Sequence, residues 1–155
     1  IFGDQNEWEI ASGVPHIPFE ALDADYEIDK EAYLEYFRKM HQLFPKCKKM
    51  LMAVRNQIAS SHHTLSGLLY DAVEDQLYTT RIYDIEPIVD PMGVGDAFIA
   101  AYIHAHQKWG DKNQYCLDFS LSASAIKNTV PGDQNLVTEE EIINNMTSSG
   151  GRIQR

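Results

Sequence analysis

The stretch from Asp90 to Phe98, DPMGVGDAF, places two glycines and two aspartates directly before an apolar segment. A glycine-rich loop that enters a helix directs several unpaired backbone N–H groups toward one point, and the helix dipole adds about half a positive charge there. Gly93 and Gly95 can adopt backbone angles that other residues avoid, and without side chains they let a phosphate approach the amides. The pattern predicts an anion site suited to phosphoryl transfer, in which positioning and electrostatic stabilisation supply most of the catalysis.

Asp96 follows the second glycine, at the expected start of the helix. A carboxylate beside an anion site can accept the proton of an attacking hydroxyl, as a general base does. Aspartate is also common as a plain helix cap, so the local pattern leaves both interpretations open. Two other phosphate motifs are excluded, because no Gly-Lys-Ser/Thr follows as in a Walker loop, and Phe98 stands where a dinucleotide fingerprint needs a small residue.

The elements that would position this turn can be predicted from hydrophobic spacing and from helix start and stop signals. The apolar run KKMLMAV predicts a buried strand of a parallel sheet over residues 48–54. Two further segments, 64–71 and 77–83, flank a polar stretch and predict an antiparallel hairpin that leads to the turn. Helices are expected over residues 4–12, 29–44, 96–109, 113–129 and from 138 onward.

The composition of the 155 residues is that of one ordinary soluble globular unit. The formal net charge of −10 argues against binding to a nucleic-acid backbone. No apolar run is long enough for a membrane span, and the start lacks a secretory signal, so we expect a cytoplasmic protein without a membrane partner. Cys47 and Cys116 match no metal spacing, and the adjacent His62 and His63 would face opposite sides of a strand.

The segment DPMGVGDAFIAAYI resembles the carboxy-terminal signature of ribokinase-like sugar kinases, an Asp-x-x-Gly-x-Gly-Asp turn followed by a buried helix. MLMAVR resembles the strand before the nucleotide loop of that family, and SASAIKNTVPGDQNLVT is similar to a helix and loop of its 2-keto-3-deoxygluconate kinase branch. The resemblance extends across nearly the whole chain. It implies a ribokinase-like, Rossmann-like three-layer α/β/α fold and an ATP-dependent kinase that phosphorylates the terminal hydroxyl of 2-keto-3-deoxygluconate.

The resemblance also implies a role for each residue of the turn. Asp96 would be the base that deprotonates the primary hydroxyl of the sugar. The amides of Gly93, Val94 and Gly95 would hold the γ-phosphate and the charge that develops on it. Asp133, in PGDQN, matches an acid that touches the substrate in 2-keto-3-deoxygluconate kinases.

The nucleotide and its metal are assigned through the same resemblance. The adenine would lie between Arg55, near the strand end, and the helix face that carries Ala123 and Lys127. The family's Asn-x-x-Glu element reads DQNE here, and Asp4 and Glu7 would help to place Mg²⁺ through water. Both acids also suit the start of a helix, so that second interpretation stays open. The resemblance leaves open whether a monovalent cation lies behind the signature loop.

Residues 1–155 would form the carboxy-terminal, nucleotide-binding portion of a single kinase domain. The chain begins with Ile1 rather than Met, and the family's amino-terminal sugar-binding half and β lid have no counterpart in it. We therefore expect the chain alone to be inactive, and any homo-oligomer to form through the missing lid. Two alternatives remain open: a kinase of a nucleoside or of a neutral sugar such as ribose or fructose, and a non-catalytic nucleotide-binding or regulatory protein.

Overall fold

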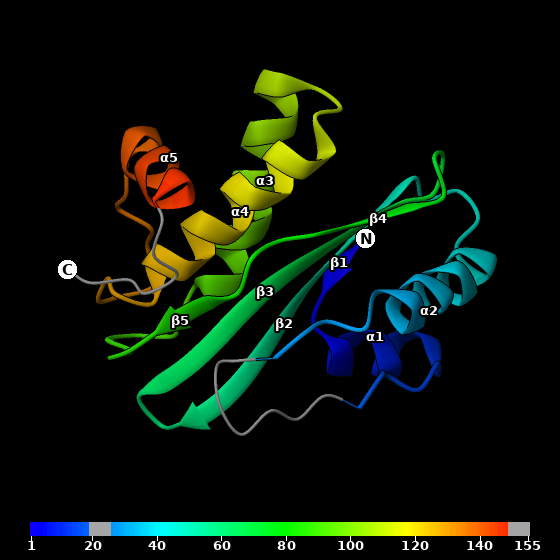
Figure 1. Cartoon of the computed structure of the whole chain (residues 1–155), viewed down its shortest axis with the longest axis horizontal. Coiled ribbons are helices and arrows are strands. Elements are labelled where there is room, and N and C mark those ends of the chain that lie inside the picture. Colours follow the sequence, from blue (N-terminus) through cyan, green and yellow to red (C-terminus); the bar gives the residue numbers. More distant parts are fainter. Residues whose placement is uncertain (19–25, 149–155) are drawn as a thin grey trace.

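The computed structural model describes residues 1–18 and 26–148, in which a five-stranded sheet lies between two groups of helices (Figure 1). The strands are β1 (Phe2–Gly3), β2 (Lys49–Ala59), β3 (His62–Asp71), β4 (Gln76–Thr79) and β5 (Tyr83–Ile85). The helices are α1 (Gln5–Ser12), α2 (Lys30–Leu43), α3 (Val94–Trp109), α4 (Asn113–Lys127) and α5 (Glu139–Thr147).

The sheet is mixed. β1 runs parallel to β2, with Phe2 opposite Leu51. β2 and β3 form a long antiparallel hairpin, and β3 also pairs antiparallel with β5 near its start and with β4 near its end. β3 is therefore the central strand, and β1 lies at one edge of the sheet.

Two separate hydrophobic clusters cover the two faces of the sheet, because side chains alternate along each strand. Met50, Met52 and Val54 of β2 belong to the cluster that includes α1 and α2. Leu51 and Ala53 of the same strand pack into the cluster formed with α3, α4 and α5. This arrangement confirms the three-layer α/β/α fold that the resemblance implies (Figure 1).

Capping residues begin three of the helices, as their sequence positions predict. Asp4 begins α1, Asp29 begins α2 and Thr138 begins α5, and each side chain accepts a hydrogen bond from a backbone N–H of the first turn. Gly13 ends α1 in the left-handed conformation with a φ of 71°. The local signals for these helices were sufficient to place the starts of all three and the end of α1.

The strands differ from the prediction. The strand expected over residues 48–54 continues to Ala59, because the exposed Arg55 and the buried Asn56 replace the continuous apolar run with alternation. The segment expected to form one hairpin strand over residues 77–83 is divided between β4 and β5. In addition, the helix expected over residues 113–129 ends at Lys127.

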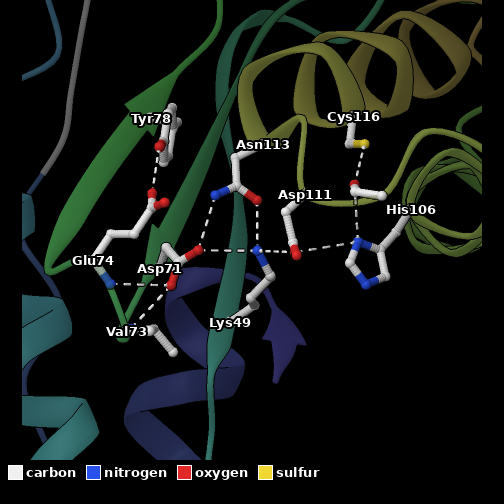
Figure 2. Close-up of polar contacts among 10 residues, drawn as sticks. Lys49, Asp71, Val73, Glu74, Tyr78, His106, Asp111, Asn113 and Cys116 are labelled. Atoms are coloured by element: carbon white, nitrogen blue, oxygen red, sulfur yellow. Dashed lines mark hydrogen bonds and ion pairs between the residues drawn. The ribbon is translucent and has the colours of Figure 1, made fainter.

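A polar cluster fastens the loop between α3 and α4 to the sheet, at the end far from β5 (Figure 2). The Nζ atom of Lys49 lies 2.9 Å from Oδ2 of Asp71 and 3.0 Å from Oδ1 of Asp111. Asn113 accepts from Lys49 at 2.6 Å and donates to Asp71 at 2.8 Å. Burial raises the pKa of Asp71, but the bonds from Lys49 and Asn113 outweigh it and lower the pKa overall.

Within the described ranges, no helix is both long and apolar enough to pass through a bilayer. Cys47 and Cys116 are free thiols. No group of three or more His, Cys, Asp or Glu side chains in the described part of the chain could hold a metal ion.

Candidate functional site

α3 begins without a side-chain cap. Its N-cap residue is Gly93, with a φ of 74°, and no side chain of the described residues bonds to the cap position. The first N–H groups of a helix have no partner within the helix, so the amides that follow Gly93 point outward from α3. A Cβ built on Gly95 would meet no atom within 4 Å. The start of α3 is therefore bare backbone with open space beside it.

Asp96 is exposed and lies in the first turn of α3, the turn that carries these amides. The helix predicted to begin at Asp96 begins at Val94, because Gly93 alone supplies the left-handed turn and Gly95 continues the helix. Asp96 is not the N-cap residue, although an acid in the first turn also suits the helix dipole, so its catalytic role stays a prediction. An acid in the same turn as open amides has the placement that a proton acceptor for phosphoryl transfer requires.

The loop that follows α4 packs directly against the start of α3. A Cβ built on Gly93 would overlap the carbonyl oxygen of Asp133, so this position accommodates only glycine. Asp90 joins the same two loops, since its Oδ1 accepts from the Met92 N–H at 2.9 Å and its Oδ2 from the Gly132 N–H at 2.8 Å. These two hydrogen bonds lower the pKa of Asp90. The motifs GVGD and PGDQN thus meet in space.

α4 holds the start of α3 and the preceding loop with small polar groups. Ser124 Oγ donates to the carbonyl oxygen of Val94 at 3.0 Å. The carbonyl oxygen of Asn128 accepts from the N–H groups of Val89 and Asp90, at 2.8 Å and 3.2 Å. Asn128 is 2% exposed, and its Nδ2 donates to the Ser124 carbonyl oxygen within α4. The loop therefore reaches α3 along a path fixed by backbone contacts.

A groove of about 280 Å³ runs along α3 beside the first turn. Its walls include the small side chains Ala97, Ala100 and Ala123, with Phe119 among them. Oδ1 of Asn135 also lines the groove, and this buried atom has no hydrogen-bond partner among the described residues. The groove suits a flat, mainly apolar ring that carries a polar edge.

No family model and no curated protein matches this sequence. Solved structures do match. The 2-dehydro-3-deoxygluconokinase from Thermotoga maritima superposes on 95% of the chain with a TM-score of 0.79 and 25% identity. A PfkB family carbohydrate kinase from Listeria grayi covers 80% of the chain with a TM-score of 0.68 and 28% identity. Ribokinase from Arabidopsis thaliana, complexed with ribose and ATP, covers 96% with a TM-score of 0.68 and 20% identity. The chain has the ribokinase-like fold.

This ribokinase-like chain spans about 40% of the length of each of these structures. The resemblance read from the signature turn is confirmed, and its structural neighbours are sugar kinases. The fold class predicted from the sequence is likewise confirmed.

The residues expected to contact the nucleotide do not share one hollow of the ribokinase-like fold. Arg55 is exposed on β2 and lines a polar hollow of about 160 Å³ with Asp4 and His16. Ala123 lines the groove along α3 instead. Lys127 is 0% exposed, so its side chain is not open to a nucleotide. The structure therefore separates these three residues, and the nucleotide contacts assigned to them stay a prediction.

Asp4 and Glu7 form a capping box at the start of α1. The Glu7 N–H donates to Asp4 Oδ1, and the Asp4 N–H donates to Glu7 Oε2, both at 2.9 Å. The box by itself leaves one oxygen of each carboxylate for water, and Mg²⁺ commonly binds through one or two carboxylates, waters and phosphates. The pair thus fits a hydrated magnesium ion beside the hollow of Arg55, and its metal role stays a prediction.

Three supporting residues were missed in the sequence: Asp90, Ser124 and Asn128. Asp90 carries a local signal, because an aspartate that bonds the N–H two residues onward is a common turn device before glycine. Ser124 and Asn128 carry none, since they bond to segments that are distant in the chain.

Proposed function

We propose that this chain carries the phosphate-binding and proton-accepting part of an ATP-dependent sugar kinase whose acceptor is 2-keto-3-deoxygluconate. The observation that carries the proposal is the uncapped start of α3, where open amides and Asp96 share one turn. Helix N-termini of this kind bind phosphate groups because their amides and dipole both favour negative charge.

In the proposed reaction, the amides of Gly93, Val94 and Gly95 hold the outer oxygens of the γ-phosphate. The hydroxyl oxygen of the sugar bonds to the γ-phosphorus, the bond from that phosphorus to ADP breaks, and the hydroxyl proton passes to the Asp96 carboxylate. The absence of a side chain at Gly95 leaves room for the phosphate. A bound Mg²⁺ would neutralise part of the phosphate charge.

ATP is proposed as the phosphate donor on two grounds, one from the site and one from a matched structure. The groove of about 280 Å³ begins at Ala97, the residue after Asp96, so a ring in it lies within reach of a phosphate at the helix start. The matched ribokinase from Arabidopsis thaliana was solved with ribose and ATP.

The sugar acid is proposed on narrower grounds. Two matched structures are described as a 2-dehydro-3-deoxygluconokinase, from Thermotoga maritima, and a putative 2-keto-3-deoxygluconate kinase, from Enterococcus faecalis. Asp133, expected to touch the substrate, is exposed and lies in the loop that packs on Gly93. A neutral sugar or a nucleoside would use the same phosphate site, so the acceptor must be identified by comparison of substrates.

The test is a kinase assay of the full-length protein with ATP and a panel of acceptors. Asp96→Asn keeps the size of the side chain but removes the proton acceptor, so kcat should fall by about 10²- to 10⁴-fold while ATP affinity changes little. Glu140→Gln, at an exposed acid of α5, is the matched control and should behave like the native protein.

Each alternative gives a distinct result. Turnover that survives Asp96→Asn nearly intact would overturn the assigned mechanism. A native protein that binds an ATP analogue but transfers no phosphate is a binding or regulatory protein. Faster turnover of ribose, fructose or a nucleoside than of 2-keto-3-deoxygluconate would replace the proposed acceptor and leave the kinase reaction standing.

A further inference from the structure

Lys127 is the most deeply buried charged residue near the start of α3. Its relative exposure is 0%, and its Nζ atom donates to the carbonyl oxygen of Val130 at 3.1 Å. An ammonium group has three donors and loses much of its hydration when buried, so it needs nearby negative charge or several oxygens. The proposed mechanism uses no contact with this side chain.

The ammonium bonds to the loop that follows α4, one of the two loops that form the phosphate site. Lys127 ends α4, and Val130, which it contacts, leads directly into the loop that packs on Gly93. Two backbone hydrogen bonds lower the pKa of Asp90, and the positive charge of Lys127 lowers it further. Asp90 is the carboxylate that joins the loops. The buried positive charge therefore attracts the negative charge that joins the loops.

A monovalent metal ion does not fit the same place. Both oxygens of Asp90 already accept backbone N–H groups, from Met92 and Gly132. The Val130 carbonyl oxygen already accepts from Lys127. These oxygens keep further lone pairs, but a metal ion at this place would have to lie close to the Lys127 ammonium, whose positive charge would repel it.

We propose that the ammonium of Lys127 is a built-in cation of the phosphate site, which takes the place of a monovalent metal ion behind the signature loop. The positive charge of Lys127 offsets the negative charge of Asp90 and keeps the Asp90 carboxylate between the Met92 and Gly132 amides. The loops then stay in the register that leaves the α3 amides open. Lys127 is thus a positioning residue. Its importance for catalysis depends on the proposed function, but its effect on the two loops is independent of that proposal.

The test measures hydrogen exchange of the Met92 and Gly132 amides without nucleotide, in potassium chloride and in choline chloride at equal ionic strength. In the native chain, the two salts should give the same exchange rates. Lys127→Met keeps a similar length but removes the charge, and should speed exchange of both amides by about tenfold or more. Lys39→Met, at an exposed lysine of α2 on the other face of the sheet, should leave them unchanged.

A second measurement separates this inference from the proposed function. ATP-analogue affinity should be equal in the two salts for the native chain and weaker by about tenfold in Lys127→Met. Potassium-dependent exchange or affinity in the native chain would overturn the built-in cation, and so would native-like exchange at both amides in Lys127→Met. If no analogue binds but the exchange results are as expected, the proposed function fails and the positioning role stands. If Lys127→Met does not fold, the salt comparison on the native chain still decides.

Discussion

Replacing Gly93 by alanine tests whether the two loops meet as the structure places them. The φ of 74° at this position costs an L-residue about 1–2 kcal/mol. The new Cβ would also overlap the Asp133 carbonyl oxygen, so the loop must shift. That shift also weakens the 2.8 Å bond from the Gly132 N–H to Asp90, which adds to the cost of the strain. We expect the free energy of unfolding to fall by more than the strain of about 1–2 kcal/mol alone.

Alanine substitutions at two other glycines separate the cost of backbone strain from the cost of a steric clash. Gly132 has a φ of 80°, but a Cβ there meets nothing within 4 Å, so Gly132→Ala should cost only the strain of about 1–2 kcal/mol. Gly95 is helical and open, so Gly95→Ala should gain about 0.5–1 kcal/mol while its methyl group weakens binding of an ATP analogue. Urea unfolding, followed by the fluorescence of Trp8 and Trp109, measures the free energy of unfolding of all three variants. A Gly93→Ala protein no less stable than Gly132→Ala would refute the reasoning.

Two further predictions concern charges outside the site. Lys49→Met removes the cation beside Asp71, which keeps its bond from Asn113, and should lower the free energy of unfolding by about 1–3 kcal/mol, against little change for the exposed Lys48→Met; equal urea midpoints for the two variants would contradict this. The pKa of Asp75 is lowered to about 2, below its ordinary 3.8, chiefly by the hydrogen bonds from Arg38. Its stabilisation is therefore complete above pH 3.8 and lost as pH falls through about 2, so Asp75→Asn should flatten thermal stability across that window, and identical acid profiles would argue against the pair.

The signature turn and the capped helices could be predicted because their information is local. Asp29 and Thr138 begin helices through contacts with backbone only three residues onward, and such contacts depend on little else in the fold. The left-handed Gly93 is equally local. The prediction misjudged Gly95, because a glycine in a turn motif and a glycine in a first helical turn look alike in the sequence.

Distant contacts account for what the sequence could not show. Arg55 and Ala123 were both expected at one nucleotide, but they line different hollows, because the first lies beside α1 and the second between α3 and α4. The burial of Lys127 depends on the same long-range packing. A lysine at the end of a helix is ordinarily solvent-exposed, and nothing in SASAIKNTV indicates otherwise.

The two ends of α3 are held by different kinds of contact, and this division bears on how the site works. The C-terminal end is followed by a loop fixed through the charged cluster of Lys49 and Asp71 (Figure 2). The N-terminal end is held by Ser124 and Asn128 through backbone oxygens, with its own amides left open. With 16 residues, α3 separates these ends by roughly 24 Å, farther than direct charge effects reach in salt. The contacts that hold the two ends are therefore independent of each other, and those at the N-terminal end use backbone oxygens rather than the first amides of α3, which stay open for a phosphate.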